Sequence, residues 1–140
     1  MRVVLDTNVV VSGFISPKGP PGRLAQAVSD GVIAPVFDAR MLDEYAEVVQ
    51  RPRIAARIDV PAALTWILML QHVGVALDQV DVYSGPLPDE DDRPFLEVAL
   101  ASGAVLVTGN AADYPKTAGV EVLTPAEAAR RFLEGVAAKR

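Results

Sequence analysis

Four acidic residues, spread along this 140-residue chain, are the best placed to do chemistry: Asp6, Glu44, Asp92 and Asp113. Carboxylates brought close together repel one another, so either their pKa values rise or a cation offsets their charge. Carboxylate oxygens are the ligands that Mg²⁺ prefers, with Mn²⁺ as the alternative. A site of this kind suits the attack of metal-activated water on a phosphodiester.

The elements that must position these acids alternate between strands and helices. Short apolar runs predict strands at residues 2–5, 32–37, 75–82, 104–108 and 120–123. Helices are predicted at residues 23–30, 38–50, 61–73 and 92–102 and from 125 to the end, with loops at 13–22, 86–92 and 109–119. This order predicts one domain over residues 1–140, a three-layer α/β/α sandwich with a central, mostly parallel sheet of four to five strands.

Ligands of such folds bind outside the carboxyl ends of the strands. Asp6 ends the first predicted strand, and Asp113 follows the strand at 104–108, so both belong at that edge. Crossover helices run antiparallel to their strands, which brings their N-termini to the same edge. The helices that carry Glu44 and Asp92 therefore begin there.

Helical phase separates these two acids from their neighbours. Glu44 borders the apolar stripe of its helix, whereas Asp43 and Glu47 fall opposite the stripe. In the next acidic helix Asp92 projects over the apolar stripe, and Glu97 is expected to face away from it. The main structural alternative is that Asp6, Asp92 and Asp113 are ordinary helix caps.

Composition narrows the function further. The chain has no cysteine, which excludes a disulfide framework, a thiolate zinc site and a cysteine nucleophile. Its net charge of −5 argues against a passive nucleic-acid binder with a basic face. No apolar stretch is long enough to span a membrane, so we expect a cytoplasmic protein without membrane contact.

With these residues in view, nearly the whole chain resembles the PIN-domain nucleases, above all the VapC-like toxins of bacterial toxin–antitoxin pairs. The matching segments are Val4-Leu5-Asp6-Thr7-Asn8-Val9, Leu42-Asp43-Glu44-Tyr45, Asp89-Glu90-Asp91-Asp92 and Leu106-Val107-Thr108-Gly109-Asn110, followed by Asp113-Tyr114-Pro115. Four motifs in the right order are far more specific than any one of them.

The resemblance implies roles for individual residues. Asp6, Glu44 and Asp92 match the acids of the first three motifs, and Asn8 and Thr108 would orient carboxylates or a bound water. Many relatives carry an Asp where this chain has Asn110. That leaves Asp113 open as a metal ligand, a group behind the ligands or a cap. Arg51 and Arg53 could contact an RNA backbone, or they are ordinary surface residues.

The resemblance also implies a function: a Mg²⁺-dependent endoribonuclease toxin that cleaves RNA, is held inactive by a small antitoxin protein and forms a homodimer. Trp66, Ile67, Met69 and Leu70 are expected in the core, but they surround their helix rather than line one face, so part of this set could form a dimer contact. Two alternatives remain. One is an inactive PIN-like RNA-binding domain, and the other is a different Mg²⁺-dependent phosphoryl-transfer protein, which Asp6-Thr7-Asn8 disfavours because a phosphatase would carry Asp-x-Asp there.

Overall fold

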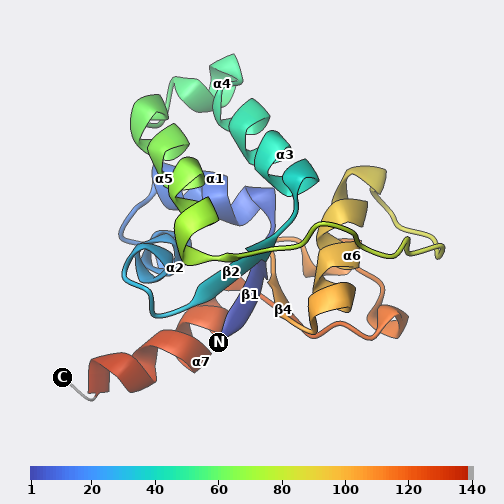
Figure 1. Ribbon diagram of the computed structural model, residues 1–140. Helices are drawn as coiled ribbons and strands as arrows, with labels where there is room; N and C mark the ends of the chain where they lie inside the picture. The colour runs from blue at the N-terminus through green and yellow to red at the C-terminus, as the bar shows by residue number, and fades with distance from the viewer. Residues whose placement is uncertain (139–140) are drawn as a thin grey trace.

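The computed structural model describes residues 1–138 and contains one five-stranded sheet (Figure 1). Its strands are β1 (Arg2–Leu5), β2 (Ala34–Phe37), β3 (Val75–Ala76), β4 (Val105–Val107) and β5 (Val122–Leu123). They lie in the order β3-β2-β1-β4-β5, and every neighbouring pair is parallel. The predicted sheet is therefore confirmed, and its central strand is the one that ends at Asp6.

Helices cover both faces of this sheet, as the sequence predicted. They are α1 (Thr7–Ile15), α2 (Pro20–Ser29), α3 (Ala39–Val49), α4 (Pro52–Ala55), α5 (Val60–Val73), α6 (Arg93–Ser102) and α7 (Pro125–Ala138). Helix α6 packs against β1, β2 and β4, while α1, α2 and α5 gather on the opposite side with α7 below them (Figure 1). Helix α3 contacts α1, α5 and α6, and so it bridges the two layers at the carboxyl end of the sheet.

Two predicted boundaries are wrong, and helices α1 and α4 were not predicted. The segment 13–22 is not one long loop, because α1 continues to Ile15 and α2 already begins at Pro20. The buried run Val9–Val11 anchors α1, and a proline suits the first turn of a helix. The predicted third strand shrinks to Val75–Ala76, and residues 77–89 form no regular element.

The end of the chain follows its local signals closely. Gly103 adopts φ +71°, the left-handed conformation that favours glycine, and so ends α6 just before β4. Thr124 and Glu127 cap the start of α7 reciprocally, with N-to-O distances of 2.9 and 3.1 Å.

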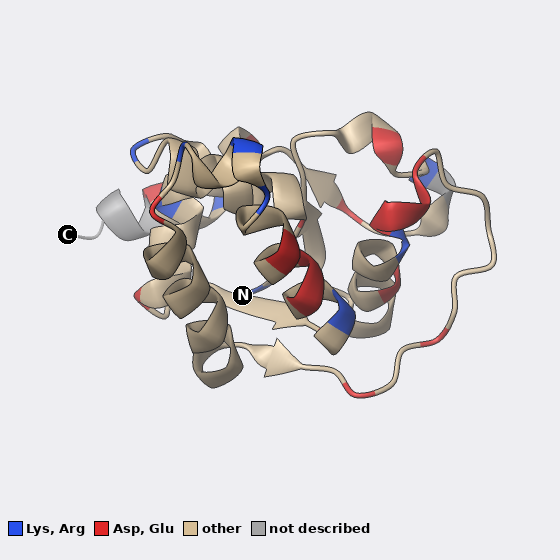
Figure 2. Cartoon of the chain, turned by 90° about the horizontal axis from the view of Figure 1, so that it is seen from above, with Lys and Arg blue, Asp and Glu red and all other residues tan. Residues whose placement is uncertain are grey.

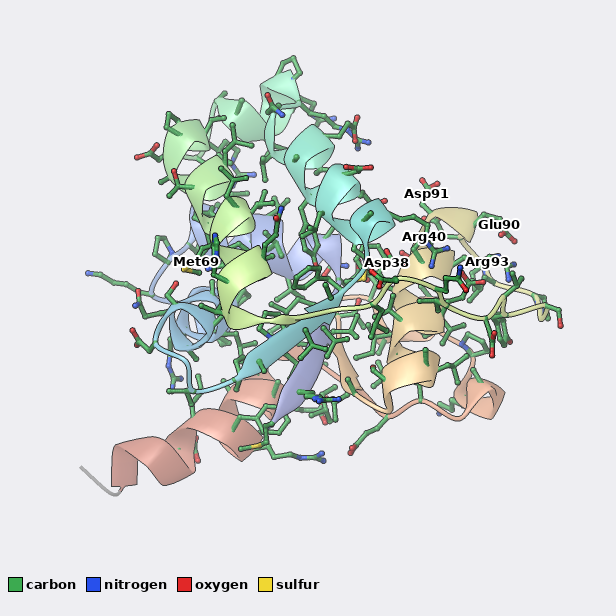
Figure 3. The ribbon with its side chains drawn as sticks, in the orientation of Figure 1. Asp38, Arg40, Met69, Glu90, Asp91 and Arg93 are labelled. Atoms are coloured by element: carbon green, nitrogen blue, oxygen red, sulfur yellow. The ribbon has the colours of Figure 1, made fainter. Side chains whose placement is uncertain are left out.

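The segment 77–89 overturns the prediction for Glu97. The carboxylate of Glu97 is only 3% exposed, because this segment covers the face of α6 that was expected to meet solvent. Glu97 accepts hydrogen bonds from the backbone N–H of Tyr83 at 2.7 Å and from Arg40 at 2.7 Å. Arg40 also binds Asp38 at 2.7 Å, and Figure 3 shows both residues at the start of α3 beside α6. The buried charge is therefore paired.

Helix α5 is apolar on more than one side. Trp66 is buried and donates from its indole N–H to the carbonyl of Ala25 at 3.1 Å, whereas Leu68 is 64% exposed. Of the four residues predicted for the core or a dimer contact, Trp66, Ile67 and Leu70 are buried and Met69 is half-buried. None of the described helices combines the length and apolar character that crossing a membrane requires.

Candidate active site

A cleft of about 340 Å³ opens at the carboxyl end of the sheet and contains all four predicted acids. Seen from above, acidic positions of α3 and of the turn before α6 lie on opposite sides of this end of the molecule (Figure 2). The cleft is lined by thirteen residues: Asp6, Thr7, Asn8, Val11, Glu44, Val48, Arg51, Ile54, Asp89, Asp91, Asp92, Asn110 and Asp113. The structure thus brings together the residues that the sequence motifs singled out.

Asp6 is the most buried of these acids, with 4% of the residue exposed. It stands at the N-cap position of α1, but its side chain makes no capping hydrogen bond. Its Oδ2 instead accepts hydrogen bonds from the hydroxyls of Thr108 at 2.8 Å and Tyr114 at 2.9 Å. Burial raises the pKa of Asp6, and these two hydrogen bonds offset only part of the effect.

Glu44 reaches the cleft from the second turn of α3. The hydroxyl of Thr7 donates a hydrogen bond to its carboxylate. Burial is the largest cause of its raised pKa, and the charges of Asp6 and Asp91 add to it. Asp43 is exposed on the same helix, and exposed Glu47 pairs with Arg51 at 2.8 Å. The phase argument therefore placed Glu44 correctly on the inner side of α3.

Asp92 approaches from the start of α6. It too occupies an N-cap position without a capping hydrogen bond, in contrast to Asp38 and Asp59, whose carboxylates do cap their helices. Burial and the negative charges of four neighbours raise the pKa of Asp92 to about 7. The neighbours, in order of effect, are Asp6, Asp89, Asp113 and Glu44. A group that is half protonated near neutral pH is one that a bound cation would ionise.

Thr108 organises the floor of the cleft. Its hydroxyl donates to Asp6 and accepts from the backbone N–H of Asn110 at 3.0 Å, with the Asn8 amide at 3.4 Å. Asn8 in turn accepts from the backbone N–H of Gly109 at 3.0 Å. These contacts tie the end of β4 to the start of α1 and hold the Asp6 carboxylate in one orientation.

Asp113 lies in the short helical turn η2 (Ala111–Asp113) and lines the cleft together with Asn110. Its charge contributes to the raised pKa of Asp92, which places the two carboxylates near each other. Asn110 uses its backbone N–H to support Thr108. In the fourth motif Asp113 therefore contributes negative charge near Asp92. Asn110 contributes a backbone N–H that supports Thr108.

The donor set fits a hard divalent cation, because the candidate ligands are all carboxylates and a cation would relieve their mutual repulsion. Within residues 1–138, however, no three His, Cys, Asp or Glu side chains are grouped closely enough to hold one ion. The carboxylates stand around the cleft rather than converging on one point.

Sequence reasoning missed three hydroxyls at the site. Tyr114 binds Asp6, Thr7 binds Glu44, and buried Tyr45 donates to the carbonyl of Leu5 directly below Asp6. Burial and neighbouring carboxylates raise the pKa of both tyrosines, so each remains a hydrogen-bond donor. The position of Tyr114 directly after Asp113 was a signal available in the sequence.

Fold and cleft define an α/β/α domain with an acidic site at the carboxyl end of a parallel sheet. The chain belongs to the PIN-domain family, because the PIN-domain family model matches residues 2–112. That match includes Asp6, Glu44 and Asp92, and it ends just before Asp113 and Tyr114.

Two similar proteins extend this comparison. The chain is 28% identical over 116 residues to the uncharacterized protein MJ1680 of Methanocaldococcus jannaschii, covering 79% of this chain and 71% of that protein. A chain in the crystal structure of VapBC2 from Rickettsia felis bound to a DNA fragment from their promoter superimposes with a TM-score of 0.55. It is 15% identical, and the match covers 89% of this chain and 98% of that one, so it supports the fold.

Proposed function

We propose that the protein is a Mg²⁺-dependent endoribonuclease that hydrolyses RNA phosphodiesters in the cytoplasm, with Mn²⁺ able to replace Mg²⁺. The observation that carries this proposal is the raised pKa of Asp92, about 7, across a cleft from buried Asp6. Asp92 stands among the negative charges of four other carboxylates, and a cluster of this kind is suited to a cation. Membership of the PIN-domain family agrees with nuclease activity.

Asp6, Asp92 and Glu44 would hold the metal ion, and Asp113 would act from beside Asp92. When bound, a divalent ion supplies positive charge that polarises the phosphate and lowers the pKa of attacking water. Thr108 and Tyr114 fix the orientation of Asp6, and Thr7 fixes that of Glu44. These hydrogen bonds limit the orientations from which Asp6 and Glu44 would bind a cation.

We further propose that the protein is the toxin of a toxin–antitoxin pair, inhibited by a small antitoxin protein and active as a homodimer. The motifs resemble those of VapC-like toxins, and the fold is similar to that of a chain in the VapBC2 structure. The homodimer rests on the same resemblance, and a contact on α5 would cover Leu68, which is 64% exposed. Sedimentation velocity of wild type and Leu68→Ser tests it: a wild-type monomer would refute the homodimer.

The nuclease proposal is tested by incubating purified protein with single-stranded RNA and Mg²⁺ or Mn²⁺. Wild type should cleave the RNA, EDTA should stop the reaction, and Asp6→Asn or Asp92→Asn should remove it. Asp43→Asn, an exposed change on the helix that carries Glu44, should keep full activity. Cleavage by Asp6→Asn in EDTA at the wild-type rate would refute the proposal.

One observation favours an inactive RNA-binding domain instead: within residues 1–138, no three metal-binding side chains are already grouped. Isothermal titration of Mn²⁺ separates the two functions. The nuclease requires a site that Asp92→Asn removes, whereas an inactive domain would give the same heat signal for wild type and variant.

A further inference from the structure

We propose that a groove around α4 binds the phosphates of single-stranded RNA next to the acidic cleft. We call it the arginine groove, and its residues are Val48, Arg51, Pro52, Arg53, Ile54 and Arg57. This inference rests on the proposed nuclease function and adds to it the surface that holds the substrate on one side of the cleavage point.

The arginine groove adjoins the acidic cleft. Its volume is about 580 Å³, and it shares Val48, Arg51 and Ile54 with the cleft wall. Figure 2 shows basic positions on the segment around α4, beside the acidic positions of α3. A strand of RNA that leaves the cleft on this side would therefore pass directly over α4.

The three arginines of the groove differ in the ion pairs that they make. Arg51 forms an ion pair with Glu47, and the charges of Glu44 and Asp91 also raise its pKa. Arg51 therefore lies at the border between the groove and the acidic cleft. Arg53 and Arg57 are exposed, and no carboxylate among the described side chains lies within ion-pair distance of either. Their positive charge is available to a ligand.

The chemistry of the groove matches a nucleic-acid backbone. Guanidinium groups bind phosphate through paired N–H donors, and Val48, Pro52 and Ile54 offer an apolar floor for ribose and base. A chain of net charge −5 with an acidic cleft repels RNA overall. Two exposed arginines at the mouth of the cleft would offset that repulsion where the substrate enters.

The test measures binding by fluorescence anisotropy in the cleavage-deficient Asp92→Asn background with Mg²⁺ present. The probe is a fluorescein-labelled oligouridine of about 20 nucleotides, and a second probe of about four nucleotides is short enough to occupy the cleft alone. Arg53→Ala/Arg57→Ala is compared with Arg23→Ala/Arg130→Ala, an exposed pair on α2 and α7 that changes the net charge equally. Arg53→Lys/Arg57→Lys restores charge without the guanidinium geometry.

Loss of two phosphate contacts should weaken binding of the long probe about 20-fold at 0.1 M salt and reduce the salt slope by about 1.4, since each single-strand contact contributes about 0.7. The short probe and the control pair should be unaffected, and the lysine variant should recover the salt slope. Equal affinities for the groove and control variants would overturn the inference. A changed sedimentation coefficient with unchanged RNA affinity would do the same, by assigning α4 to protein contacts.

The two proposals can fail separately. If wild type does not cleave RNA but the groove variant still loses affinity for the long probe, the nuclease function fails and the arginine groove stands. If wild type cleaves RNA and the groove variant binds and cleaves the long probe normally, only the arginine groove fails.

Discussion

Replacing Asp92 with Asn should stabilise the metal-free protein at pH 8 while removing its activity. Burial and the charges of neighbouring carboxylates raise the pKa of Asp92 from 3.8 to about 7 in the folded protein. The ionised form is therefore disfavoured by folding, and the folded state binds more protons than the unfolded state between these two values. Stability is consequently lost as the pH rises from about 4 to about 7.

The size of the effect follows from the same difference. At full strength, a change from 3.8 to about 7 corresponds to about 4 kcal/mol. Asp92 is only half-buried, so solvent screening reduces this to about 1 to 2 kcal/mol. Asn has nearly the same shape and no charge, so the variant should gain that amount at pH 8. In a domain of this size, Tm should rise by about 3 to 7 °C.

Thermal unfolding in EDTA at pH 8 and pH 4 measures the effect. Wild type and Asp92→Asn should differ at pH 8 and converge at pH 4, where the carboxyl is mostly protonated. Asp43→Asn, exposed on α3, is the matched control and should leave Tm unchanged at both pH values. A destabilised Asp92→Asn variant at pH 8 would refute the reasoning, since it would mean that the carboxylate stabilises the fold.

Three further predictions concern the same framework. Mg²⁺ should raise the Tm of wild type more at pH 8 than at pH 5, because the pKa of about 7 at Asp92 makes protons compete with the ion, and the increase should be smaller for Asp92→Asn in differential scanning fluorimetry. Tyr114→Phe should cost about 1 kcal/mol in urea unfolding and raise the Mg²⁺ concentration needed for half-maximal cleavage, because Asp6 loses one of its two hydroxyl donors; an unchanged metal requirement would contradict this. Arg40→Ala should cost about 3 kcal/mol, because it leaves buried Glu97 without its cation, and adding Glu97→Gln should recover part of the loss; additive costs in the urea double-mutant cycle would contradict the pairing.

Local sequence patterns predicted the features of the fold and site that depend on short-range geometry. The order of strands and helices predicted the parallel sheet, because alternation of this kind leaves few topologies open. Helical phase distinguished Glu44 from Asp43, because the direction of a side chain on a helix depends on its position alone. The edge rule placed Asp6 and Asp113 in one cleft although they are far apart in the chain.

Helical phase gave the wrong result where a segment outside the helix determines whether a side chain is buried. Glu97 lies on the polar side of α6, but residues 77–89 cover that side, and Tyr83 is held there by both Glu97 and Arg93. Figure 3 shows Arg93 at the start of α6, where this segment passes. The spacing of apolar residues in α6 does not indicate that another segment covers its polar side. The contact of Tyr114 with Asp6 was also missed, because it arises only after β4 pairs with β1, although the position of Tyr114 directly after Asp113 was a signal in the sequence.

The hydrogen bonds that orient Asp6 join residues far apart in the chain: Thr108 lies 102 positions away and Tyr114 lies 108 positions away. The backbone N–H of Asp6 also bonds to Val107 at 2.9 Å, on the strand that flanks β1. During synthesis Asp6 is therefore made long before Thr108 and Tyr114, which orient it. A fragment that lacks β4 and the residues after it would keep Asp6, Glu44 and Asp92 but expose one edge of β1, and an exposed strand edge is prone to pair with other chains. The order of synthesis thus delays assembly of the site until β4, Thr108 and Tyr114 have been made.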